Sequence, residues 1–277
     1  MIEQNSFFRT SAAVTLISIL FGIFRLLNIP FQFYLWEFFI DTKILTVAGI
    51  IILFVKRKEV AFSGDQMRFL SFNWQKNIWF FLLPLGVFLI PIAVGIGVGE
   101  VTVNKLNNVS TLILATIFDI PAIYIFTLTS VFIEEIIFRG IFFVSFREKS
   151  SIRNAQFLSG CLWVAYSFSE IAAIEELHWS TISTLLLYYF MQHLICSSLV
   201  VHYSSVWPGY SFRVGMISIT PILLSSLSIE SDSFFKTNSS FFVAEGIIVS
   251  ILLIIISLRI LSITSNLTKI QENGNFS

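Results

Sequence analysis

Two glutamates and an arginine lie within the otherwise apolar stretch VFIEEIIFRG, residues 131–140. Glu135 and Arg139 are four residues apart, so in a helix they share a face and can form an ion pair. Glu134 points about 100° away from Glu135 on an α-helix, and Arg139 therefore satisfies Glu134 less readily. A carboxylate without a fixed partner suits a general base or acid. The alternative is a buried ion-pair network that only holds helices together.

The composition of the chain indicates that these charges are surrounded by apolar residues. Of the 277 residues, 56% are hydrophobic and 12% are charged, whereas a soluble domain carries about 25% charged residues. The mean hydropathy is +0.84, and several runs reach the roughly 20 apolar residues that cross a bilayer as a helix. The sequence therefore predicts an all-α, polytopic membrane protein. Because the formal net charge is +0, nucleic acid is not expected as a partner.

About eight transmembrane helices are expected from the apolar runs. Residues 99–119 are ambiguous and could hold a short re-entrant or interfacial piece. The predicted spans lie near residues 11–29, 34–55, 78–98, 120–146, 155–174, 180–201, 207–228 and 241–263.

The spans divide the chain into three parts. Residues 1–77 form an N-terminal two-span region with an interfacial loop, residues 78–264 form the core, and residues 265–277 form a tail. Basic residues follow the second and the fourth span, and these two loops lie on the same side because an even number of spans separates them. Since short basic loops stay in the cytoplasm, this side is predicted to be cytoplasmic, as are both termini. The basic residues are Lys56, Arg57 and Lys58, then Arg147, Lys149 and Arg153.

The order of motifs resembles the CAAX protease and bacteriocin-processing family. EEIIFR fits the EExxxR pattern of these eight-span membrane proteins, which include the prenyl-protein endopeptidases. SGCLWVAYSFSEI, SSVWPGYSFRVGM and FFVAEGIIVSILLI follow in the family's order, so that the resemblance covers about residues 78–263. It implies an intramembrane endopeptidase in which Glu134 activates a water molecule with the help of a histidine. Glu135 and Arg139 would support this site.

The chain departs from the family at the positions of both expected histidines. Ser167 stands where the FxxxH histidine is expected, Arg213 replaces the histidine of HxxxN, and Ile217 replaces its asparagine or aspartate. Serine does not act as a base at neutral pH without an activating partner, and arginine cannot accept a proton. Arg213 could stabilise an oxyanion or neutralise Glu134.

The histidines that the chain does contain are poorly placed to replace the two family histidines. His178 and His202 lie near the ends of predicted spans, and only His193 lies deep within one. A single histidine within a span more often forms a hydrogen bond between helices than it catalyses a reaction. There is no HExxH motif and no cluster of His and Cys, so neither a metal nor another cofactor is expected.

Two main functions remain open from the sequence. The first is an intramembrane endopeptidase that acts on membrane-associated or lipidated peptides, with membrane lipid as its surroundings. The second is a catalytically impaired family member that binds such a peptide or serves as a partner subunit of another membrane protein. A transporter is a weaker alternative, because no internal repeat and no pair of interrupted spans is visible.

Overall fold

The computed structural model describes residues 73–99, 101–103, 121–171, 179–225, 227–229 and 251–259, with single positions among residues 9–20 and at residue 262. Most of the first predicted span, all of the second, and the tail lie outside the described residues. So do most of the ambiguous segment 99–119 and His178.

The predicted spans between residues 78 and 228 coincide with helices to within a few residues, and residues 251–259 are helical inside the last predicted span. Two described stretches, Asn77–Gly97 and Leu185–Tyr203, are long and apolar enough to cross a membrane by length and composition. The helices are α4 (Trp74–Val98), α6 (Pro121–Glu135), η3 (Ile136–Phe142), α7 (Phe143–Arg147), α8 (Ile152–Ile171), α9 (Trp179–Tyr203) and α10 (Trp207–Ser225).

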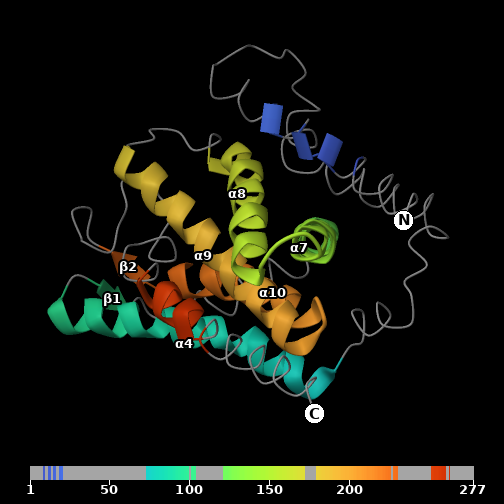
Figure 1. Ribbon diagram of the computed structural model, residues 1–277. Coiled ribbons are helices and arrows are strands. Elements are labelled where there is room, and N and C mark those ends of the chain that lie inside the picture. Colours follow the sequence, from blue (N-terminus) through green and yellow to red (C-terminus); the bar gives the residue numbers. More distant parts are fainter. Residues whose placement is uncertain are drawn as a thin grey trace.

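The helices pack in a sequence that differs from their order in the chain. α4 lies along α10, α10 also packs against α9, and α9 packs against α8 (Figure 1). The α6–η3–α7 helix contacts α10 through α6 and α8 through α7. As a result, residues from α6, η3, α8, α9 and α10 share one interior.

The predicted span over residues 120–146 is a continuous helix that changes type in its middle. η3 is a π-helix of 7 residues between α6 and α7. The backbone N–H of Phe143 donates to the carbonyl of Phe138, five residues earlier, which is the hydrogen bond of a π-helix. The prediction treated this span as an α-helix, and the π-helix follows directly after Glu135.

The fold is helical, as predicted, and a short pair of strands accompanies the helices. β1 (Val101–Val103) pairs antiparallel with β2 (Leu227–Ile229), and Val101 lies opposite Ile229. β1 follows α4 and β2 follows α10, so both helices end at this ribbon and run in the same direction (Figure 1). The predicted span over residues 207–228 is accordingly too long, because its last residues belong to β2.

Gly215 allows a close approach between α4 and α10. A Cβ atom at this position would collide with the backbone carbonyl of Phe81 and would lie 3.0 Å from Cγ of Pro84. Since a backbone atom cannot move aside like the end of a flexible side chain, any larger residue must push the two helices apart.

Gly215→Ala is therefore expected to lower the free energy of unfolding by about 1–3 kcal/mol, the range typical of overpacking. The measurement is unfolding of the purified protein in mixed detergent micelles. Gly86→Ala on α4 is the matched control, because a Cβ there meets nothing within 4 Å and alanine favours a helix by about 1 kcal/mol. Equal stability of the two variants would contradict the tight contact.

Candidate active site

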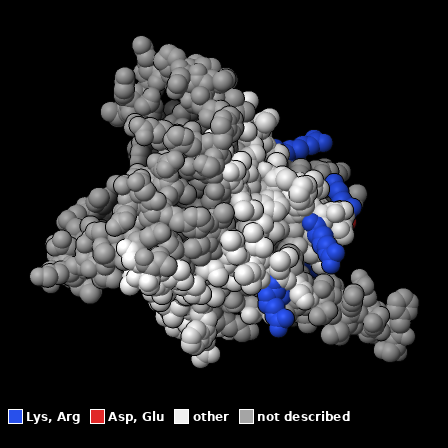
Figure 2. Space-filling view, turned by 90° about the vertical axis from the view of Figure 1, so that its left-hand side faces the viewer, with Lys and Arg blue, Asp and Glu red and all other residues white. Residues whose placement is uncertain are grey.

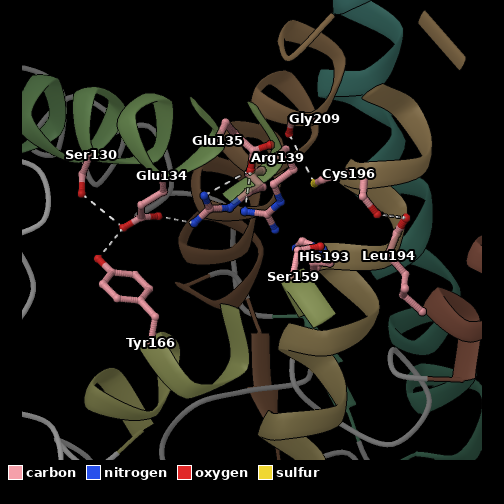
Figure 3. Close-up of polar contacts among 12 residues, drawn as sticks. Ser130, Glu134, Glu135, Arg139, Ser159, Tyr166, His193, Leu194, Cys196 and Gly209 are labelled. Atoms are coloured by element: carbon pink, nitrogen blue, oxygen red, sulfur yellow. Dashed lines mark hydrogen bonds and ion pairs between the residues drawn. The ribbon is translucent and has the colours of Figure 1, made fainter. Parts of the chain in front are cut away.

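Glu134, at the end of α6, makes contacts with three other side chains. Its Oε2 lies 2.6 Å from Nη2 of Arg213 on α10. Its Oε1 accepts hydrogen bonds from the hydroxyl of Tyr166 at 3.0 Å and from that of Ser130 at 3.4 Å (Figure 3). The prediction that Glu134 is the less satisfied carboxylate is wrong, because it considered only Arg139 as a partner.

Glu135 lies deeper than Glu134 and shares a single oxygen between two arginines. Its Oε1 is 3.1 Å from Nη1 of Arg139 and 3.3 Å from Nη1 of Arg213. Its Oε2 has no hydrogen-bond partner among the described residues and lies against Gly209 of α10, where a Cβ would come within 2.8 Å of it. The predicted ion pair between Glu135 and Arg139 is confirmed.

These four residues, Glu134, Glu135, Arg139 and Arg213, are called the charged cluster below. The side chains of Glu135 and Arg139 are 0% exposed, whereas those of Glu134 and Arg213 are 5% and 7% exposed. The formal charges of the cluster cancel, and the attraction between them offsets part of the cost of burying two carboxylates and two guanidiniums. Within the cluster, only Glu134 and Arg213 keep any exposed side-chain surface.

Trp163 of α8 supports both arginines of the cluster. The guanidinium carbons lie 4.3 Å (Arg139) and 4.5 Å (Arg213) from the centre of its ring. A cation over a tryptophan face is attracted by the ring's quadrupole, and more strongly so away from water. Trp163 is 1% exposed and packs edge-on against Phe138. The contact with Trp163 compensates in part for the nitrogens of Arg139, which make no hydrogen bond in the described part of the chain.

The three positions at which the chain departs from the family pattern differ in their contact with the charged cluster. Ser167 is fully buried on α8, next to Tyr166 in the chain, and its hydroxyl has no hydrogen-bond partner among the described residues. Ile217 lies on α10, one turn beyond Arg213, and is half-buried. Arg213 alone among the three replaced positions touches both glutamates.

His193 takes part in a second polar group, between α8 and α9. Its Nε2 lies 2.8 Å from the hydroxyl of Ser159, so the prediction of a hydrogen bond between helices is confirmed. Gln156 of α8 donates to the hydroxyls of Ser197 and Ser198 of α9, and all of these side chains are buried. His193 is therefore a connection between two helices, and its hydrogen bond is directed to Ser159, not to a glutamate.

Sequence reasoning missed Tyr166, Ser130 and Trp163. Ser130 is one helical turn before Glu134, so the spacing alone could have indicated its contact. Tyr166 and Trp163 come from a different helix, and no local pattern shows which of the many aromatic residues faces a charge. Among the described residues, no group of three or more His, Cys, Asp or Glu side chains is placed to hold a metal ion.

The site is thus a buried cluster of two glutamates and two arginines that is carried by packed apolar helices. Residues 115–216 match the family described as type II CAAX prenyl endopeptidase Rce1-like. The matched segment contains all four residues of the charged cluster and both positions of the missing histidines. The match supports the resemblance to the CAAX protease and bacteriocin-processing family found in the sequence, over this segment of the chain. A comparison with curated proteins finds no match.

Proposed function

We propose that the protein is an intramembrane endopeptidase that hydrolyses peptide bonds of membrane-associated or lipidated substrates. The observation that carries the proposal is the position of Glu134. It is the glutamate of the charged cluster that keeps some exposed surface, and it lies within the segment that matches a prenyl endopeptidase family. CAAX-type proteases act on peptides at a membrane, and two helices of this chain are apolar and long enough to cross one.

The proposed reaction assigns one role to each member of the charged cluster. Glu134 accepts a proton from a water molecule as the water oxygen attacks the carbonyl carbon of the scissile bond. Arg213 stabilises the negative charge that forms on the carbonyl oxygen. When the tetrahedral intermediate collapses and the C–N bond breaks, Glu134 returns the proton to the leaving nitrogen. Glu135 and Arg139 hold Arg213 in place from the buried side.

Glu134→Gln tests this proposal directly. The amide cannot take a proton from water, and the rate of hydrolysis is expected to fall by at least about 100-fold, the usual contribution of a general base. The measurement uses the protein in lipid vesicles and an internally quenched, farnesylated CAAX-type peptide.

Glu148→Gln is the matched control for this experiment, because Glu148 is an exposed glutamate in the turn after α7. Cleavage at the wild-type rate by a folded Glu134→Gln variant would remove Glu134 from the mechanism. Comparison of the two variants by circular dichroism in the same vesicles establishes that both are folded.

The second candidate function is a catalytically impaired family member that binds a peptide or a partner protein. One observation favours it: Arg213, at a position where the family has a histidine, pairs with Glu134 at 2.6 Å and also contacts Glu135. Such a network can serve to hold α6 and α10 together. A wild-type protein that binds the farnesylated peptide but leaves it uncleaved would favour this function over the first.

We further propose a multi-pass membrane protein with both termini in the cytoplasm and residues 78–264 as its core. Exposed apolar side chains along α4, such as Trp79, Leu89 and Ile90, suit contact with lipid. Lys and Arg side chains gather along one edge of the surface (Figure 2), and Arg147, Lys149 and Arg153 are exposed in and around the turn from α7 to α8. Basic residues on a single side are typical of the cytoplasmic face.

A further inference from the structure

Tyr166 brings a hydroxyl from α8 to the carboxylate of Glu134 on α6. The hydroxyl donates to Oε1 at 3.0 Å, and Ser130 donates to the same oxygen at 3.4 Å. Figure 3 shows both side chains directed at this oxygen, Ser130 from above and Tyr166 from below in this view, while the other oxygen contacts the guanidinium of Arg213. Tyr166 is 2% exposed, so water competes little for its hydrogen bond.

The ring of Tyr166 is held by its aromatic neighbours. Its centre lies 5.2 Å from that of Phe138 and 5.7 Å from that of Trp163. A tyrosine has only two side-chain torsions that place its hydroxyl, and packing of this kind fixes both. The hydroxyl is therefore in position before any substrate arrives.

Counting hydrogen-bond acceptors leaves one direction open on Glu134. An ionised carboxylate offers about four acceptor directions, two on each oxygen. Tyr166 and Ser130 occupy the two directions of Oε1, and Arg213 occupies one of Oε2. Among the described residues, no second partner is found for Oε2, which is the oxygen that contacts Arg213.

We infer that Tyr166 is a positioning residue for Glu134. Its hydrogen bond fixes the rotation of the carboxylate, so that the open direction of Oε2 receives the water molecule next to Arg213. The last torsion of a glutamate has a broad, two-fold preference, and without the hydroxyl the carboxylate turns more freely about its contact with Arg213. The role of the water in hydrolysis rests on the proposed function, whereas the orientation of the carboxylate does not.

Tyr166→Phe tests the inference, because it removes the hydroxyl and keeps the ring between Phe138 and Trp163. In the farnesylated-peptide assay, kcat is expected to fall about 10- to 100-fold, since small errors in position cost factors of this size, and KM is expected to stay unchanged. Tyr203→Phe is the control: Tyr203 ends α9 and its ring packs against Phe80 and His202. A Tyr166→Phe variant with the kcat of the wild type would overturn the inference.

A second measurement separates this inference from the proposed function. The infrared carboxylate stretching band that disappears in Glu134→Gln reports on Glu134 alone, and Tyr166→Phe is expected to shift or broaden it, whereas Tyr203→Phe leaves it unchanged. A band that stays the same in Tyr166→Phe contradicts the positioning role, whatever the activity. A changed band in a protein whose wild type cleaves no peptide would overturn the proposed function and leave the orientation of Glu134 by Tyr166 in place.

Discussion

Arg213→Met is expected to lower the free energy of unfolding by about 3–5 kcal/mol, the usual cost of breaking a buried ion pair by removing one partner. Methionine fills much of the same space but leaves Glu134 and Glu135 with a single arginine between them. Glu134 would keep only the hydroxyls of Tyr166 and Ser130 as partners. Unfolding in mixed detergent micelles, followed by circular dichroism, measures the loss.

Two further variants identify the cause of this loss. Arg213→Lys keeps the charge, but a lysine cannot reach both carboxylates with the flat fork of a guanidinium, and an intermediate loss is expected. The double variant Glu134→Gln/Arg213→Met restores the balance of charge and should recover part of the stability. If Arg213→Met alone is as stable as the wild type, the charged cluster does not hold α6 and α10 together.

Trp163→Ala is expected to cost about 3–5 kcal/mol, the range found for removing a buried tryptophan. Trp163 is among the largest fully buried side chains and lies under both guanidinium groups. Its loss leaves a cavity among Phe138, Tyr166 and Tyr189, whose rings pack against it. The same unfolding measurement applies.

Trp163→Phe separates packing from the contact with the arginines. Phenylalanine retains a smaller ring with a weaker attraction for cations, so the loss should be clearly smaller than for alanine. A loss as large as that of alanine would mean that the indole itself is required. Equal stability of wild type and Trp163→Ala would contradict the supporting role assigned to Trp163.

The sequence predicted those parts of the site that depend on local spacing. The pair of Glu135 and Arg139 follows from their separation by four residues, and their burial follows from the apolar residues around them. The helices between residues 78 and 228 were predicted because long apolar runs have few alternatives. β1 and β2 were missed because three-residue strands at the ends of apolar runs have no distinct pattern.

Contacts between residues far apart in the chain could not be predicted from the sequence. Arg213 and Glu134 are 79 residues apart, and their contact depends on how α10 packs against α6. The sequence raised neutralisation of Glu134 by Arg213 as one of two roles and gave no reason to prefer it. Tyr166 presents the same difficulty, because seven tyrosines offer no local sign of which one faces a carboxylate. The π-helix also lacks a sequence pattern of its own, since its apolar residues suit an α-helix equally well.

The cancelling charges of the cluster have a consequence for a protein in an energised membrane. A membrane voltage acts on net charge, with about 2.3 kcal/mol per elementary charge for each 100 mV crossed. Two acids and two guanidiniums that move as one rigid unit feel almost none of this force, so tilting of the helices that carry them is nearly independent of voltage. A cluster that loses Arg213 carries one uncompensated charge, and its position would then respond to the electrical state of the cell.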